Sequence, residues 1–225
     1  MKQYIFNLSE VIYDKVFPQY RVKTKAHIIE ILMEITRFIL LQNDPEFVVD
    51  EQNSKGKVVL YIDKMSRLFF FSENKYYSIV FPFHFLEENG KFKIVFQSTI
   101  EVNSQLISKV ISIIQCDEFK TQCSLDFVEP ICDAEDDCDE NFWIFLRELL
   151  LMEDGYIRYD FDQEEYDKAR ERGEEDRHPL NHYDFFYSSK ATFKLGLNNK
   201  ISNDDFIDLI NIRTNCEYLT KPSTE

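Results

Sequence analysis

Apolar residues recur at intervals of three and four along several stretches of the chain, and this spacing is typical of amphipathic helices. The clearest stretch is 24–42, where Thr24 is placed to cap the helix and Pro45 follows its end. Residues 104–115 show the same period, whereas residues 141–152 are apolar on nearly all sides. The pattern therefore predicts a long helix over each of these stretches.

Two shorter helices are predicted nearer the ends of the chain. One covers residues 7–17 and is ended by Pro18, which cannot continue a helix. The other opens at Ser202, where the spacing to Asp205 has the form of a capping box. Its apolar positions place a C-terminal helix within residues 201–215.

Between residues 46 and 100 the pattern changes to short runs rich in β-branched and aromatic residues, which is typical of strands. These runs cover residues 58–62, 67–71, 76–85 and 91–99. Asn89-Gly90 predicts a hairpin turn between the last two runs, and Pro82 indicates an edge strand or a bulge in the third. We expect one antiparallel meander of four or five strands.

Two further strand-like segments flank a charged excursion, 163–177, within the stretch 155–196. Alternate positions of the first strand share one polar face, which consists of Tyr156, Arg158, Asp160 and Asp162. Alternate positions of the second strand share another, which consists of His182, Asp184 and Phe186. Antiparallel pairing of the two strands brings these faces together. The residues that we expect to lie close to one another are Arg158, Asp160, His182 and Asp184.

Together these elements predict a single α+β domain, residues 1–220, in which helices pack on an antiparallel sheet. Its expected parts are a helical N-terminal part (1–45), a β-meander (46–100), a helical part (101–152), a β-hairpin with a charged insert (153–200) and a C-terminal helix (201–215).

The charge balance narrows the classes of function. The 225 residues include 26 Lys and Arg against 41 Asp and Glu, which gives a net charge of −15. Such a field repels phosphate backbones at long range, so steering of the whole protein onto nucleic acid is not expected. A locally basic groove would have to come from separate segments, because no dense Lys/Arg run exists. The acidic surface either keeps the protein in solution or meets a basic partner protein.

The sequence predicts a cytoplasmic location. The N-terminal residues lack the pattern of a signal peptide, and no segment approaches the roughly 18–20 apolar residues of a membrane helix. The five cysteines form no Cys-x-x-Cys pair, so we expect free thiols and no zinc site. The acidic run 129–140 lacks the glycine of a calcium loop and is predicted to be a solvated loop. No cofactor is expected.

The two histidines of the stretch 155–196 support one chemical interpretation. His178 and His182 can serve as general base and acid while Arg158 or Arg177 holds a phosphate, an arrangement that suits metal-independent RNA cleavage. Pro179 lies between the histidines and disfavours a helix there, so the His-x-x-x-His geometry of metalloproteases does not apply.

Two other interpretations use the carboxylates. In one, Asp160, Asp162 and a histidine hold a divalent cation for hydrolysis. In the other, the polar residues form an internal ion-pair network that fixes two strands and performs no chemistry. The sequence leaves these alternatives open.

Trp143 belongs to the helix predicted over 141–152 and is the only tryptophan. This helix is apolar on nearly all sides, so it is either enclosed in the core or docked on another chain. Trp143 is therefore a candidate contact residue. The other candidates for binding are Asp162, Arg177 and Asp184.

Four segments carry a resemblance to an uncharacterised bacterial family, a domain of unknown function. They are RYDFD, HPLNHYDF after the charged insert, FKLGL and the helix FIDLI, and they span roughly residues 140–215. The family has an Arg-Tyr-Asp strand, a His-Pro-x-x-His motif, a short apolar strand and a closing helix. The matching positions are Arg158, Asp160, His178, Pro179 and His182. The chain departs from the family where DFFYSS stands in place of a small, glycine-containing strand. The resemblance implies a setting in prokaryotic mobile or antiviral-defence loci and brings no established activity.

Two functional hypotheses follow. The first is an accessory or regulatory subunit of a bacterial antiviral-defence assembly that acts through protein contacts, with an ATPase or a nuclease subunit as examples of a partner. The acidity, the apolar helix around Trp143 and the lack of a complete catalytic motif favour it. The second is a nuclease-like effector that cleaves RNA or DNA with a set of four residues, namely His178, His182, Arg158 and Asp160.

Overall fold

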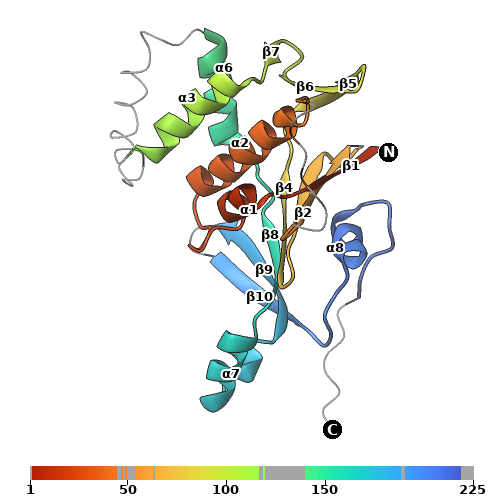
Figure 1. Cartoon of the computed structure of the whole chain (residues 1–225). Coiled ribbons are helices and arrows are strands. Elements are labelled where there is room, and N and C mark those ends of the chain that lie inside the picture. Colours follow the sequence, from red (N-terminus) through yellow and green to blue (C-terminus); the bar gives the residue numbers. More distant parts are fainter. Residues whose placement is uncertain are drawn as a thin grey trace.

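Antiparallel strands form two sheets, and helices pack against both faces of the larger one (Figure 1). The computed structural model describes residues 2–44, 47, 49, 54–62, 64–116, 119, 140–188 and 191–218. Within these residues the larger sheet has seven strands, in the spatial order β1 (Lys2–Asn7), β2 (Lys57–Ile62), β3 (Arg67–Phe71), β4 (Lys75–Val80), β8 (Ile157–Phe161), β9 (Asn181–Ser188) and β10 (Ala191–Leu197). The smaller sheet consists of β5 (His84–Glu88), β6 (Lys91–Phe96) and β7 (Ile100–Glu101). The predicted α+β class is confirmed.

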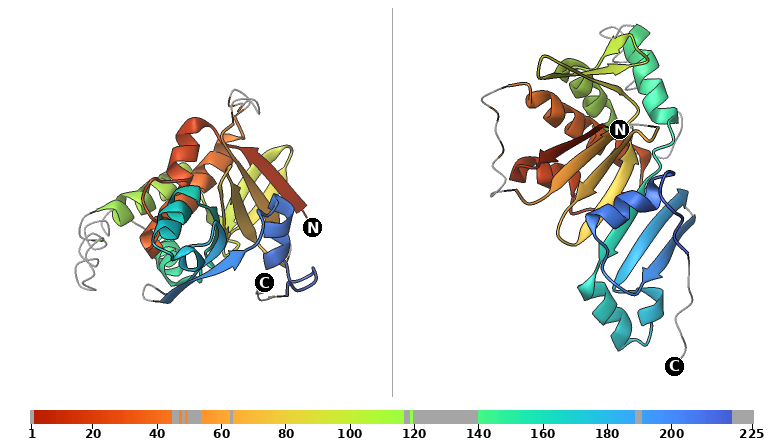
Figure 2. Two further views of the ribbon diagram at one scale, coloured as in Figure 1. Left: turned by 90° about the horizontal axis from the view of Figure 1, so that it is seen from below. Right: turned by 90° about the vertical axis from the view of Figure 1, so that its right-hand side faces the viewer.

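The helices divide between the two faces of the larger sheet (Figures 1 and 2). On one face lie α1 (Glu10–Val16), α2 (Lys25–Leu41), α3 (Ser104–Gln115) and α6 (Glu140–Leu151). On the other face lies α8 (Asn203–Ile210). A further helix, α7 (Gln163–Glu171), and the 3₁₀ turn Glu175–Arg177 project beyond the end of the sheet.

The central strands are apolar on both sides because both faces of the sheet are covered. In β3, Leu68 and Phe70 belong to the core beneath α2, whereas Phe69 and Phe71 belong to the core beneath α8. This double burial explains why residues 68–71 form a continuous apolar run instead of alternating with polar residues.

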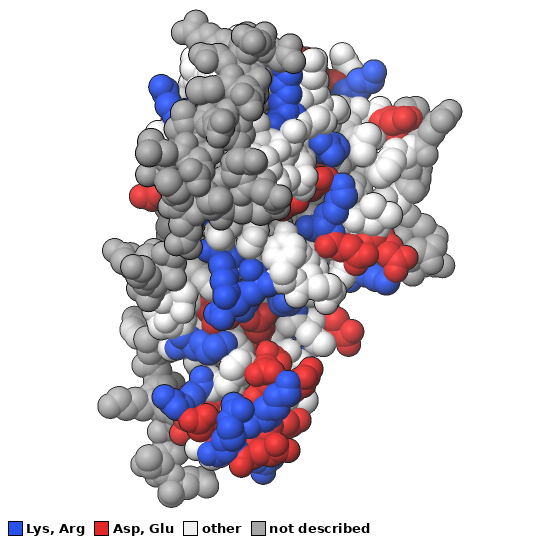
Figure 3. All heavy atoms as spheres, turned by 90° about the vertical axis from the view of Figure 1, so that its left-hand side faces the viewer, with Lys and Arg blue, Asp and Glu red and all other residues white. Residues whose placement is uncertain are grey.

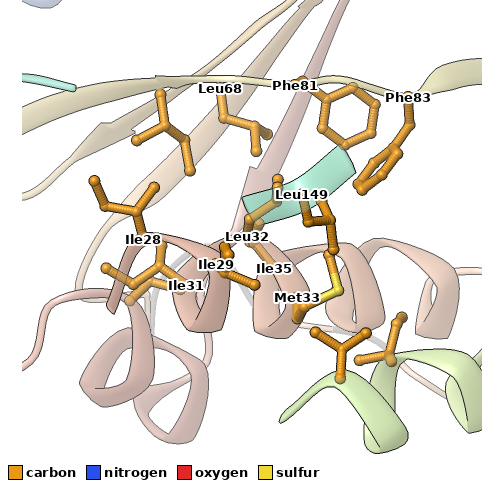
Figure 4. Packing of buried hydrophobic residues seen from close by; sticks show 14 of the residues in the cluster. Ile28, Ile29, Ile31, Leu32, Met33, Ile35, Leu68, Phe81, Phe83 and Leu149 are labelled. Carbon is orange, nitrogen blue, oxygen red and sulfur yellow. The ribbon is translucent and has the colours of Figure 1, made fainter. Parts of the chain in front are cut away.

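The helix α2 supplies much of the apolar surface that packs on the sheet. Its buried apolar residues include Ile28, Ile29, Ile31, Leu32, Met33 and Ile35. Figure 4 shows them packed close to Leu68 of β3, Phe81 and Phe83 beyond β4, and Leu149 of α6. The hydroxyl of Thr24 accepts a hydrogen bond from the backbone N–H of His27, so Thr24 caps α2 as predicted.

The other predicted helices are present, α3 and α6 within one residue of their predicted bounds, whereas α1 begins three residues later and α8 ends five residues earlier than predicted. α1 ends before Pro18, and α3 covers the predicted range 104–115. The capping box of α8 is formed by Ser202 and Asp205, whose side chains each accept a hydrogen bond from the other's backbone N–H. α6 buries its apolar surface within the chain, through Phe142, Phe145, Leu146 and Leu149.

The prediction of one meander over residues 46–100 is wrong. β4 ends at Val80, and the chain leaves the larger sheet at Pro82 to begin the smaller one. Proline has no N–H to donate to a strand ladder, so the run 76–85 cannot continue as one strand. The Asn89-Gly90 turn is confirmed between β5 and β6, since both residues have the positive φ (53° and 74°) that this turn requires.

The sequence pattern also does not predict β1. The segment 1–45 is expected to be helical, but Lys2–Asn7 pairs along its whole length with β2. Most of the acidic run 129–140 lies outside the described residues. Cys116 and Cys216 are free thiols. The described helices include none with the length and apolar character needed to cross a bilayer.

Phe206 tests the packing of α8. Its ring is 0% exposed and lies against Phe69, Phe71, Tyr76 and Tyr183. We expect Phe206→Ala to lower the free energy of unfolding by about 3–5 kcal/mol, because it leaves a cavity on the sheet. The control is Ile212→Ala, at a position beyond α8 that is 79% exposed. This variant should change the free energy of unfolding by less than about 0.5 kcal/mol. Urea denaturation measures both, and equal effects would contradict this packing.

Candidate functional site

The polar residues of the stretch 155–196 meet on one face of β8, β9 and β10. The pairing of β8 with β9 places Arg158 opposite Asp184 and Asp160 opposite His182, as the sequence predicts. The pairing of β10 with β9 places Lys194 opposite Asp184. Directly opposed residues in antiparallel strands point to the same face, so side chains from three strands converge.

This polar face lies on the same side of the sheet as α1 and α2. Arg158 is opposite Tyr77 of β4, whose ring belongs to the core beneath these helices. The alternate residues Tyr159 and Tyr183 point the other way, toward α8. α6 packs against α2 at the far end of the helical layer and does not reach the polar face (Figure 1).

Two hollows flank the polar face. The first has a volume of about 390 Å³ and is bordered by residues 16–22 together with Arg158 and Asp160. The second has a volume of about 350 Å³ and is bordered by Arg177, Asp184 and Lys194. Arg21 borders both. Figure 3 shows this side of the molecule, where Lys and Arg side chains gather over the middle and acidic atoms lie beneath them.

Arg158 bridges two carboxylates from neighbouring strands. Its Nε donates to Oδ2 of Asp160 at 2.6 Å, and its Nη2 donates to Oδ2 of Asp184. Lys194 adds a second cation, with Nζ 3.2 Å from Oδ1 of Asp184. Burial alone would raise the pKa of Asp184, but Arg158 and Lys194 outweigh it and hold that pKa below its ordinary range. Both carboxylates are therefore paired.

His182 is enclosed within this group, with 1% of its side chain exposed. Its Nδ1 lies 2.7 Å from the carbonyl oxygen of Pro179, which can only accept, so Nδ1 carries the proton. Its Nε2 lies 2.6 Å from Nζ of Lys194 and therefore accepts from the ammonium. Burial and the neighbouring Lys194 lower the pKa of His182, so the imidazole is neutral near pH 7.

The unprotonated nitrogen of His182 faces the two carboxylates. Nε2 is 3.9 Å from Oδ2 of Asp160 and 3.9 Å from Oδ2 of Asp184. One ligand atom from each of the three residues lies within 4.8 Å of the other two. This set of one imidazole and two carboxylates can coordinate a divalent cation.

Comparisons of the chain with protein family models, with curated proteins and with solved structures found no match. The resemblance to the uncharacterised bacterial family stays a prediction. A functional site is inferred from the geometry of the polar face alone.

His178 lies beside the group, with its ring centroid 4.9 Å from that of His182. Its Nδ1 atom is buried and has no hydrogen-bond partner among the described residues. Arg177 is at the rim of the second hollow, where it donates to Glu174 and is 79% exposed. The structure thus brings His182 and Asp184 together with Arg158 and Asp160, as predicted, and places His178 beside them.

Asp162 and Trp143 are not part of this group. The carboxylate of Asp162 caps α7 by accepting a hydrogen bond from the N–H of Glu165. Asp162 borders the first hollow but is not one of the three grouped ligands, which are Asp160, His182 and Asp184. Trp143 packs partly buried against the core, next to Phe142. The cation interpretation therefore uses Asp184 where the sequence suggested Asp162.

Lys194 belongs to this group but is not among the residues predicted from the sequence. In the run ATFKLGL, alternate positions share one face of a strand, so Thr192, Lys194 and Gly196 point to the same side. This alternation is the sequence signal that could have identified Lys194. Gly196 lies opposite His182, and a Cβ at Gly196 would stand 2.8 Å from Cγ of Pro179. The glycine therefore lets Pro179 lie close enough to place its carbonyl on His182.

Arg158→Met tests the ion pairs. The variant leaves two buried carboxylates without their shared guanidinium, so we expect a loss of about 3–5 kcal/mol in the free energy of unfolding at pH 7. The loss should shrink toward pH 4. Without Arg158 the carboxylate of Asp184 takes up a proton at a higher pH, whereas in the wild type the lowered pKa of Asp184 means that its stabilisation is lost as pH falls.

The matched control is Arg177→Met, which removes an exposed guanidinium and should cost less than about 1 kcal/mol. Denaturant unfolding at several pH values measures both variants. An effect of Arg158→Met as small as that of the control would mean that the two carboxylates do not depend on Arg158.

Proposed function

We propose that the protein hydrolyses phosphodiester bonds and acts as a nuclease-like effector. The observation that carries the proposal is the convergence of Asp160, His182 and Asp184 beside a hollow bordered by three cations. The cations are Arg21, Arg177 and Lys194. Hydrolysis of a phosphodiester needs negative groups that orient a water and positive groups that hold the phosphate, and both are present here.

The burial of the charged residues supports a role beyond stability. Removing Asp160, Asp184 and Arg158 from water costs free energy that their mutual attraction offsets only in part. Apolar residues of similar size would stabilise these strands as well or better. Asp184 borders a hollow and has a shifted pKa, and this combination is typical of functional sites.

The cations around the second hollow come from separate segments. Arg21 lies between α1 and α2, Arg177 ends the 3₁₀ turn and Lys194 lies on β10. These three cations outnumber the two carboxylates at the same hollow, Asp176 and Asp184, in a chain whose net charge is −15. Arginine donors match the oxygens of a phosphate, so these cations support binding of a single phosphodiester group more than long-range steering of a polymer.

The roles of the histidines differ from those first expected. Both nitrogens of His182 have partners and its side chain is enclosed, so His182 is not free to exchange protons with a substrate. His178 is the more exposed of the two and is the better candidate for proton transfer. Asp184 borders the hollow directly and is the carboxylate placed to orient a water.

A subunit of an antiviral-defence assembly is the second candidate function. The specific observation in its favour is the exposed Leu151, which is 71% accessible at the end of α6. The rest of the apolar surface of α6 packs within the chain, so it gives less support to docking than the sequence indicated. The defence setting itself stays a prediction.

Cleavage assays test the proposed activity. We expect the purified chain to cleave single-stranded RNA, single-stranded DNA or duplex DNA in buffer with Mg²⁺ and Mn²⁺ salts. Asp184→Asn should lower kcat at least about 100-fold, which is the scale of a lost acid–base group. The control is Asp162→Asn, because asparagine still caps α7 and the residue does not face His182. Absence of cleavage of all three substrates, or full activity of Asp184→Asn, would refute the proposal.

A further inference from the structure

We infer that Asp160, Asp184 and Nε2 of His182 form a binding site for one divalent transition-metal cation, and that the ammonium of Lys194 takes its place when no cation is bound. The role of the cation in hydrolysis rests on the proposed function. The binding itself does not, and it can be measured without any assay of activity.

The distances between the three ligands fit one cation. Bonds of about 2.0–2.2 Å to nitrogen and oxygen allow two ligand atoms to stand up to about 4.2 Å apart. Nε2 of His182 is 3.9 Å from Oδ2 of each aspartate, and all three ligand atoms lie within 4.8 Å. The ligands come from the paired strands β8 and β9, whose backbone ladder fixes their spacing. Small rotations of the carboxylates close the remaining gap.

The ligands are already in the state that a cation requires. Metal ions bind neutral imidazole and ionised carboxylate, so any protons must first be released. His182 keeps its proton on Nδ1, bonded to the carbonyl of Pro179, and presents Nε2 without one. Metal-binding histidines are held in this way by a partner on the other ring nitrogen.

Arg158 can remain in place when a cation binds. It contacts one oxygen of each aspartate, and a carboxylate has about four acceptor positions over its two oxygens. The guanidinium therefore acts as an outer partner that orients both carboxylates, which is a common feature of metal sites. Asp160 and Asp184 are thereby held toward His182.

Lys194 behaves as a substitute cation. Its Nζ is 2.6 Å from Nε2 of His182 and 3.2 Å from Oδ1 of Asp184, so it contacts two of the three ligands. Its side chain is 27% exposed and borders the second hollow, into which it can turn. A divalent cation would release Lys194 into that hollow beside Arg177, where it adds a positive charge for a phosphate.

The donor set selects the class of cation. One imidazole with two carboxylates suits Mn²⁺, Fe²⁺ or Zn²⁺, whereas Ca²⁺ and Mg²⁺ prefer sites made of oxygen alone. Mn²⁺ is the practical probe, because its binding can be followed both by calorimetry and by electron paramagnetic resonance.

Titration of the full chain with MnCl₂ tests the inference. We expect one Mn²⁺ per chain, and binding weakened more than about 100-fold in Asp184→Asn and in His182→Gln, beyond the loss caused by an outer partner. Lys194→Met should bind Mn²⁺ roughly tenfold more tightly, because the competing positive charge is removed. The control Asp162→Asn should bind as the wild type does. Circular dichroism checks that each variant is folded.

Two results would overturn the inference. One is the absence of Mn²⁺ and Zn²⁺ binding by both the wild type and Lys194→Met. The other is binding that persists unchanged in Asp184→Asn and His182→Gln, which would locate the ion elsewhere, for example on the acidic run 129–140. Mn²⁺ binding at this site without any cleavage would refute the proposed activity and leave the cation site standing. Cleavage in EDTA without Mn²⁺ binding would do the reverse.

Discussion

The bridge that Arg158 forms between Asp160 and Asp184 is the interaction on which the polar face depends. Both carboxylates are buried, so each would remain ionised only at a high cost in free energy without a cation beside it. The planar donors of arginine can meet two carboxylates at once, which a lysine ammonium does less well. The same bridge favours one strand register. A slip of β9 by one residue would turn Asp184 and His182 toward the apolar side under α8.

This polar face also limits how far the helical layer can extend over the sheet. The core beneath α1 and α2 reaches Tyr77 and Tyr156, and the first hollow begins where Arg158 follows them. A helix laid over these largely buried charged residues would remove the rest of their surface from water without supplying new partners. The segment 16–22 borders the hollow there, and its Arg21 faces both hollows. The boundary between core and site is thus set by where the charges begin.

The local pattern predicts the helices and much of the site, because both follow from short-range periodicity. Alternation in residues 156–162 and 182–186 is enough to bring Arg158 and Asp160 to Asp184 and His182. It does not show which strands distant in sequence lie side by side, so the pairing of β1 with β2 is not predictable from it. Pro82 indicates a break in the run 76–85, but not that a second sheet begins there. Alternation also does not place Lys194 beside Asp184, because that contact depends on the register of β10 against β9.

Lys194 and a bound cation are alternatives that compensate the same negative charge. With Lys194 inserted, Arg158 and Lys194 balance Asp160 and Asp184, and His182 is neutral, so the buried group carries no net charge. The fold can therefore form before any ion is present, because no buried carboxylate waits for a partner. A divalent cation that replaces Lys194 adds positive charge beside the second hollow and moves the ammonium into it. Binding of the cation would then be coupled to binding of an anionic substrate through Lys194. The ammonium that leaves Asp184 and His182 is the same group that contacts the phosphate in the hollow.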